Sequence, residues 1–160
     1  MARATNHHNS DHPHDQVNND LIVEFLLQVE AAEATRVKYR GHLQEFRRWL
    51  AQRQAQASDA PSALLTDVTA ADIQRFMAYL RSPDRIGSGR WGGALAPSSR
   101  RTFLASLRVF YRFLVTVGVV ASDPTAAVRP PRTTLTPGLC LDGDELRRLL
   151  ESPGTPRERM

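Results

Sequence analysis

The chain has 160 residues, enough for one helical domain with tails and a buried core. Its net charge of +4 is unevenly spread: residues 35–132 hold sixteen basic and six acidic residues, whereas residues 1–34 hold one basic and six acidic residues. No apolar run approaches the roughly 20 residues of a membrane span, the N-terminus lacks an apolar signal core, and Cys140 is the lone cysteine. These features argue against a membrane protein or a disulfide-rich secreted one, and they fit a cytoplasmic protein with an anionic partner.

Residues 1–19 are polar and are predicted to form a disordered tail. The tail contains His7, His8, His12 and His14, which raise the alternative of a metal site. Because no cysteine or ordered scaffold accompanies them, a flexible polar tail is the favoured interpretation, and no cofactor is expected.

Two amphipathic helices are predicted next. The first covers 20–33 and places Leu21, Phe25 and Val29 on one face. The second covers 36–53, with Thr35 as its N-cap. Its apolar stripe has the spacing i, i+4, i+7, i+11 and consists of Tyr39, Leu43, Phe46 and Leu50. A different face of the same helix carries Arg36, Arg40 and Arg47, with Lys38 near its leading end.

A low-complexity linker is predicted over 51–63, followed by a third helix that ends near Arg81. Thr69 and Asp72 have the spacing of a capping box, and Val68 and Ile73 that of a hydrophobic staple. The inward face of this helix should hold Ile73, Phe76, Met77 and Leu80. The glycine-rich loop 82–96 follows, and its Trp91 either packs against the domain, which is favoured, or stacks on a base or sugar.

The fourth predicted helix, 98–117, lies in a stretch from Arg85 to Ser122 that contains no acidic residue. Its apolar stripe consists of Phe103, Leu107, Phe110 and Leu114, widened by Leu104 and Tyr111. A basic stripe with the spacing i, i+7, i+11 consists of Arg101, Arg108 and Arg112, and Ala105 fills the missing turn. Gly118 should end the helix. A helix that is apolar on one side and cationic on the other requires an anionic partner, and a groove of DNA can hold such a helix.

The C-terminal part begins with a short helical turn over 123–128 and continues into a proline-stiffened linker. Asp142 to Glu145 forms a second capping box, which starts a helix ending near Glu151. The apolar face of that helix has nothing after it to pack on, so we expect it to be the first helix of a second domain. The predicted organisation is a tail (1–19), a DNA-binding domain (20–129), a linker (130–141) and the start of a truncated second domain (142–160).

Several of these segments resemble tyrosine recombinases of the phage integrase and Xer type. Residues 35–46 are similar to that family's T-x-x-x-Y-x-x-x-L-x-x-F helix, and residues 99–111 to its T-x-x-R-x-L-x-A-L-R-x-F-Y helix, with Ser99 for Thr and Thr102 where a base is common. Residues 123–132 resemble the N-P-A…P-K exit into the interdomain linker, with Asp123 for Asn. Residues 141–150 resemble the opening of the catalytic domain, so the resemblance implies that 142–160 are the start of a truncated catalytic domain.

The resemblance implies an all-α fold, a four- to five-helix orthogonal bundle of the SAM-like, core-binding kind. It implies double-stranded DNA as the partner, with other recombinase protomers on the same DNA, and no small-molecule substrate. Two crossing helices, matching 36–53 and 98–117, would approach the major groove. The candidate DNA-contacting residues are Arg36, Lys38, Arg40, Arg100, Arg101, Arg108, Arg112, Arg129 and Arg132. Phosphate contact is the expected role for most of them, whereas Arg108 has the alternative of bracing the bundle internally.

The resemblance also implies that this chain does not cut DNA by itself. The family's chemistry uses a nucleophilic tyrosine supported by arginine, lysine and histidine residues of the catalytic domain. Tyr39, Tyr79 and Tyr111 stand at apolar-face positions and are expected to belong to the core. Two alternatives remain: a helical protein-interaction module using Trp91 and the C-terminal helix, and an enzyme of another class such as a nuclease, for which the acidic residues of 35–132 are too scattered.

Overall fold

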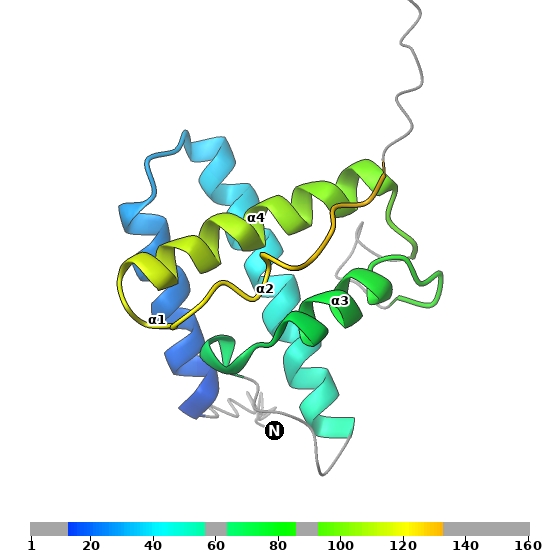
Figure 1. The fold of residues 1–160 in the computed structure, drawn as a ribbon, viewed down its shortest axis with the longest axis horizontal. Coiled ribbons are helices and arrows are strands. Elements are labelled where there is room, and N and C mark those ends of the chain that lie inside the picture. The colour runs from blue at the N-terminus through cyan, green and yellow to red at the C-terminus, as the bar shows by residue number, and fades with distance from the viewer. Residues whose placement is uncertain (1–12, 57–63, 86–92, 133–160) are drawn as a thin grey trace, which may run out of the picture.

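A computed structural model describes residues 13–56, 64–85 and 93–132 of the chain. Within these ranges it consists of four α-helices and one short 3-10 helix, and it contains no strand. The expected all-α class is therefore confirmed. Figure 1 shows α4 crossing in front of α2, with α1 on one side of this crossing and α3 on the other. None of the helices in the described ranges is long and apolar enough to cross a membrane.

The first helix, α1 (Pro13–Gln28), begins earlier than the predicted start at residue 20 and ends before residue 33. Residues 13–19 therefore do not belong to a disordered tail, which corrects that prediction; residues 1–12 lie outside the described ranges. Residues 13–19 are polar in sequence, yet one of them has a structural role in the domain. The Asn18 side chain is buried, and its Oδ1 accepts a hydrogen bond of 2.8 Å from the backbone N–H of Leu65.

The second helix, α2 (Glu33–Gln56), is longer than predicted at both ends. Thr35 is not its N-cap, because the backbone N–H groups of Thr35 and Arg36 both donate to the carbonyl oxygen of Ala32. At the other end, the first residues of the predicted linker continue the helix. The last turn of α2 consists of residues with good helix propensity, such as glutamine and arginine, and it has no apolar stripe from which a helix could be predicted.

The third helix, α3 (Ala70–Tyr79), starts with the predicted capping box. The Asp72 N–H donates to the Thr69 side chain, and the Thr69 N–H donates to the Asp72 carboxylate. The 3-10 helix η1 (Leu65–Asp67) precedes it and buries Leu65 completely. The predicted inward residues are confirmed for Ile73, Phe76 and Leu80, which are fully buried, while Met77 packs partly buried against the core.

The fourth helix, α4 (Pro97–Thr116), matches the predicted 98–117 closely. Proline occupies its first turn, where a missing N–H costs nothing. Gly118 has a φ of +74°, the left-handed conformation that commonly follows a helix end. All six predicted apolar residues of the helix are buried: Phe103, Leu104, Leu107, Phe110, Tyr111 and Leu114.

The core forms where α1, α2 and α3 pack against the apolar face of α4. Its centre is aromatic: the Phe25 and Phe110 rings meet edge to face at 5.4 Å, and those of Phe46 and Phe76 at 4.8 Å. The hydroxyl of buried Tyr111 donates to the carbonyl oxygen of Leu65, 3.0 Å away. Burial of these side chains is the main stabilising contribution, since each removes a large apolar area from water.

The segment after α4 returns along the domain in an extended path and leaves it beside the start of α4 (Figure 1). Residues 124–127 form a hydrogen-bonded turn at the place of the predicted short turn of helix, with the N–H groups of Ala126 and Val128 donating to the carbonyl oxygens of Asp123 and Thr125. The Asp123 carboxylate shapes the turn by accepting hydrogen bonds from the backbone N–H and the hydroxyl of Thr125. Val128 anchors the segment, since only 5% of it is exposed. Trp91, the linker beyond Arg132 and the predicted helix ending near Glu151 lie outside the described residues.

Candidate nucleic-acid interface

The crossing of α2 and α4 is joined by a buried polar pair. The Nδ1 of His42 and the Oγ of Ser106 lie 2.7 Å apart, and Ser106 Oγ donates to the Thr102 carbonyl oxygen. When the Ser106 hydroxyl donates to Thr102, its oxygen can accept from a protonated Nδ1 of the neutral His42 ring. The His42 ring also packs on Phe103, with centroids 4.0 Å apart. These contacts fix how the two helices cross.

His42 stays neutral at physiological pH. Burial, together with a smaller contribution from the nearby positive charge of Lys38, lowers its pKa from 6.5 to about 4. The buried contact of His42 between α2 and α4 is therefore uncharged. The positive charge beside this contact belongs to Lys38, which is exposed.

A small hollow of about 170 Å³ lies at this edge of the crossing, lined by Lys38 and His42 from α2 and by Ser99, Thr102 and Phe103 from α4. Its lining combines the ammonium group of Lys38 with the hydroxyl groups of Ser99 and Thr102 from the N-terminal part of α4. The first turn of α4 contains no acidic residue, and the N–H groups at this end of the helix form the positive end of the helix dipole. Such an arrangement is chemically suited to an anion such as a phosphate group.

Arg36 and Arg40 do not share this hollow with Lys38. They line a different one of about 300 Å³, which α2 forms with Ile22, Val23 and Leu26 of α1. Arg36 also forms an ion pair of 3.0 Å with Glu33, one turn earlier. The structure therefore separates the predicted α2 residues, with Lys38 facing α4 and the two arginines facing α1.

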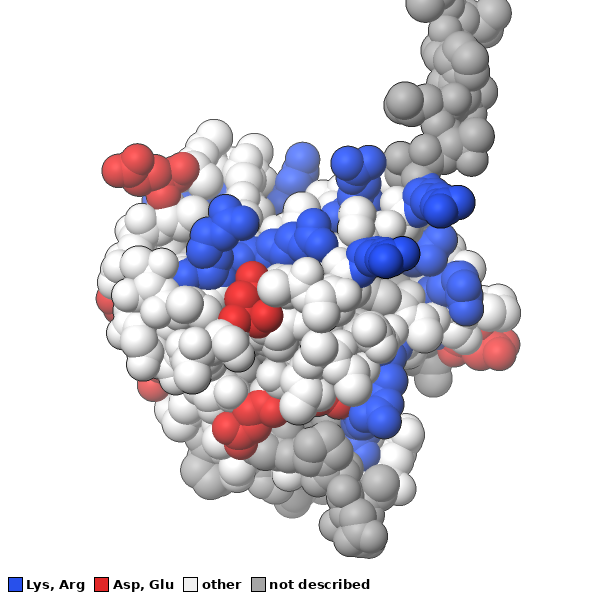
Figure 2. Space-filling model, viewed as in Figure 1, with Lys and Arg blue, Asp and Glu red and all other residues white. Residues whose placement is uncertain are grey.

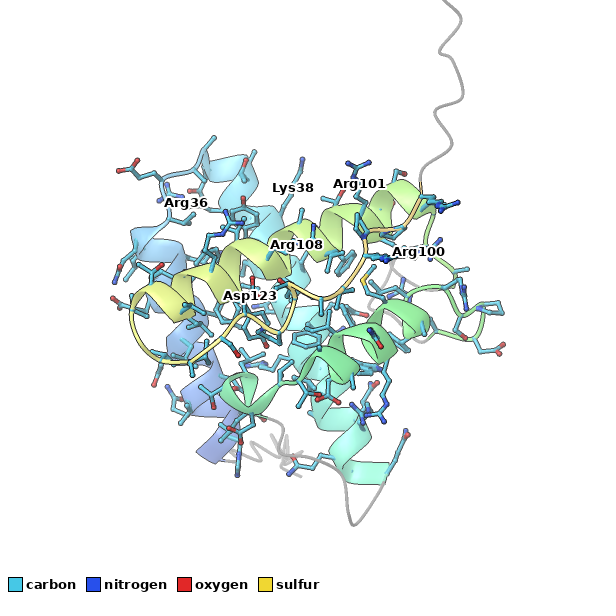
Figure 3. All side chains as sticks on the ribbon, viewed as in Figure 1. Arg36, Lys38, Arg100, Arg101, Arg108 and Asp123 are labelled. Atoms are coloured by element: carbon cyan, nitrogen blue, oxygen red, sulfur yellow. The ribbon has the colours of Figure 1, made fainter. Side chains whose placement is uncertain are left out.

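The basic stripe of α4 divides in a similar way. Arg101 and Arg112 are exposed, and so is the small Ala105 between them. Arg108 is partly buried, and its Nη2 donates a hydrogen bond of 2.7 Å to the carbonyl oxygen of Val128. Figure 3 shows Arg108 on the front of α4 beside the returning segment, with Asp123 below it. Arg108 therefore braces the domain, the alternative that the sequence left open.

Arg85 is not a surface cation, although the acid-free stretch suggested one. Its side chain is fully buried and forms an ion pair of 3.0 Å with Glu45 of α2. Its Nε donates to the carbonyl oxygen of Gly93, 2.9 Å away. The acid that neutralises Arg85 lies 40 residues away in sequence, so a local count of charges could not reveal the pair.

Three arginines come together beside the start of α4, around a hollow distinct from the one at Lys38. Arg100 of α4 and Arg129 of the returning segment were predicted as site residues, and Arg81 at the end of α3 joins them around a hollow of about 250 Å³. Sequence reasoning missed Arg81, because no local pattern indicates that the end of α3 meets the segment leaving the domain. Arg132, also predicted, is exposed on that segment.

The basic side chains gather on one face. In Figure 2 they spread over α4 and the adjoining parts of α2 and the returning segment, while acidic side chains are sparser there. Figure 3 places Arg36, Lys38 and Arg101 along one edge of this face, and Arg100 at the end of α4 nearest α3. The described residues contain no group of three histidine, cysteine, aspartate or glutamate side chains that could hold a metal ion. We call the set Lys38, Arg100, Arg101, Arg112, Arg129 and Arg132 the basic face.

The described tyrosines are built into the domain. Tyr111 is completely buried, and burial raises the pKa of its hydroxyl well above 10. Tyr39 and Tyr79 are partly buried and pack against the core. Tyr79 lies against Trp49, and Tyr39 against Phe25. The expectation that all three support the core is therefore confirmed.

Comparison with known proteins yields one family. Residues 20–118 match the phage integrase N-terminal SAM-like domain. The chain is 28% identical over 141 residues to tyrosine recombinase XerD of Lacticaseibacillus casei, covering 86% of this chain and 42% of that protein. It is 30% identical over 147 residues to tyrosine recombinase XerD of Pseudomonas putida, covering 89% of this chain and 41% of that protein.

The chain thus spans about two fifths of the length of these curated relatives. No solved structure matches it with significance. The matched region contains α2, α3 and α4, and therefore the helical crossing and most of the basic face. On this match, the chain belongs to the phage integrase family through its N-terminal SAM-like domain.

Proposed function

We propose that this chain binds double-stranded DNA as the core-binding domain of a site-specific tyrosine recombinase. The observation that carries the proposal is the basic face, on which cations from α2, α4 and the returning segment gather with few acidic side chains among them (Figure 2). The family membership supports the same function, because its relatives are named as recombinases. Most contacts would be made to phosphate groups, which position a protein on DNA without reading its sequence.

We further propose that the chain holds DNA without cutting it. A nucleophilic tyrosine has to reach a phosphorus atom with an activated hydroxyl. The Tyr111 hydroxyl is buried and already donates to the Leu65 carbonyl oxygen, and its pKa is raised. His42 is buried, neutral and bonded to Ser106. Neither group is available for acid–base or nucleophilic chemistry on a bound strand.

A direct test measures binding of a fluorescent DNA duplex by anisotropy at two salt concentrations. If about four phosphates are contacted, affinity should fall about 100-fold between 50 and 200 mM salt. The variant Arg101→Gln/Arg112→Gln should bind more weakly and keep its fold. The matched control is Arg75→Gln on α3, whose side chain is 61% exposed and lies outside the basic face. Affinity that does not change with salt would refute the proposal.

A second function, contact between protomers on DNA, is favoured by an apolar strip on α1. Val23 is 48% exposed and Leu27 is 73% exposed, beside the hollow that α1 forms with α2. We propose that this strip packs against a second copy when two copies bind neighbouring sites. Binding to a two-site duplex should be cooperative for the native chain and lose its cooperativity in Val23→Ser/Leu27→Ser, while affinity for a one-site duplex stays the same. Equal cooperativity in both proteins would exclude the strip as the contact.

A further inference from the structure

The hollow between the end of α3, the start of α4 and the returning segment has the features of a phosphate-binding site. It has a volume of about 250 Å³ and is lined by Gln74, Met77, Ala78, Arg81, Arg100, Arg129 and Pro131. Three guanidinium groups and one amide can donate hydrogen bonds into it, and no carboxylate lines it. A water molecule takes up about 30 Å³, so a hollow of about 250 Å³ has room for a phosphate group.

The three arginines lack a compensating acid in the described part of the chain. None of the ion pairs found there involves Arg81, Arg100 or Arg129, whereas Arg36, Arg48, Arg53, Arg75 and Arg85 each have a carboxylate partner. The Nε of Arg100 is also buried without a hydrogen-bond partner in these residues. Like charges held together repel one another, and a buried donor without an acceptor is costly. An anion in the hollow would offset the repulsion between the arginines and supply an acceptor for the Arg100 Nε–H.

The apolar part of the lining also favours binding of an anion in the hollow. Met77, Ala78 and Pro131 contribute apolar surface, which lowers the local dielectric constant and strengthens attraction between an anion and the guanidinium groups. Guanidinium also matches phosphate geometry, because two of its N–H groups can donate in parallel to two oxygens.

We propose that this hollow binds one backbone phosphate of DNA, with Arg81 as a contact in addition to Arg100 and Arg129. This inference rests on the proposed DNA binding and deepens it. Since Gln74 comes from α3, Arg81 from the turn that follows it, and Arg129 from the returning segment, the bound phosphate connects that segment to the helices. DNA binding thereby fixes the direction in which the chain leaves the domain.

The test compares Arg81→Gln with Arg75→Gln, which removes a charge from the neighbouring helix α3 but outside the hollow. In the anisotropy assay, Arg81→Gln should weaken DNA binding about fivefold and reduce the salt slope by about 1, the effect of one lost phosphate contact. Arg75→Gln should bind like the native chain. Equal DNA affinity and salt slope in the two variants would overturn the inference while leaving the proposed function standing.

A second measurement tests phosphate binding in the hollow independently of DNA binding. Inorganic phosphate is titrated into the native chain at constant ionic strength, and the NMR signals of the Gln74 side-chain amide and the Arg81 Nε–H are followed. A saturable shift that is absent from the Gln74 amide in Arg81→Gln supports a phosphate site, even if the native chain fails to bind DNA. No saturable shift in the native chain, or the same shift in the variant, contradicts it.

Discussion

The guanidinium of Arg85 and the carboxylate of Glu45 form a buried ion pair, with Nη1 and Oε1 3.0 Å apart. The pair connects the segment after α3 to the middle of α2. Glu45 also accepts from Arg48 at 2.7 Å, so its two oxygens are engaged by two arginines. The Arg85 guanidinium lies 5.8 Å from the centroid of the Tyr79 ring, which adds a cation–π contact. Arg85 is therefore part of the scaffold that supports the basic face.

Replacing Arg85 with methionine should destabilise the domain by about 3 kcal/mol, as expected when one partner of a buried ion pair is removed and the other charge remains. Urea unfolding followed by circular dichroism measures this loss. The double variant Arg85→Met/Glu45→Met should recover part of it, because the buried carboxylate, which the single variant leaves with the half-exposed Arg48 alone, is then removed as well. Arg112→Met, on the surface of α4, provides the exposed control. If Arg85→Met and Arg112→Met unfold at the same urea concentration, the ion pair is not a structural brace.

The stability of the domain should fall on acidification through the window in which His42 titrates. Its pKa is about 4 in the folded chain and 6.5 when exposed, so the unfolded state binds the extra proton first. Stability from the neutral ring is fully present above pH 6.5, is lost as the pH falls towards 4, and changes no further below that. The shift corresponds to a loss of about 3 kcal/mol.

The measurement is the free energy of unfolding at pH 7 and pH 4.5 for the native chain and for His42→Gln. Carboxylates titrate in both proteins, so only the difference between their pH profiles reports on His42. The native chain should lose more stability than the variant over this interval. Parallel profiles would show that protonation of His42 does not affect the crossing of α2 and α4.

The capping box at the start of α3 should contribute measurably to stability. Thr69→Ala removes the side-chain acceptor for the Asp72 N–H and a hydroxyl donor to the Asp72 carboxylate. The expected cost is about 1 kcal/mol, measured by urea unfolding. Thr116→Ala is a matched control, because the Thr116 hydroxyl bonds only to the Arg112 carbonyl oxygen within its own helix. Equal effects of the two substitutions would contradict a special role for the cap.

Sequence reasoning succeeded where the cause is local. The apolar stripe of α4 has the helical period, and Thr69 and Asp72 have the spacing of a capping box, so both could be predicted. It failed where the cause is tertiary. Asn18 looks like a tail residue until Leu65, 47 positions later, donates to it. Arg85 looks like a surface cation until Glu45 is found beside it, and Arg81 gains significance only because the returning segment brings Arg129 close.

The two arginines of the α4 stripe should separate stability from DNA binding. Arg108→Met removes the hydrogen bond to the Val128 carbonyl oxygen, which is charge-assisted and partly buried, and should cost about 2 kcal/mol of folding free energy. Arg112→Met removes an exposed charge from the basic face, so it should leave urea unfolding unchanged and weaken DNA binding severalfold with a smaller salt slope. Both variants lose one positive charge and receive the same side chain, so any difference reflects position. If Arg108→Met proves as stable as the native chain and loses more DNA affinity than Arg112→Met, then Arg108 leaves Val128 to contact DNA.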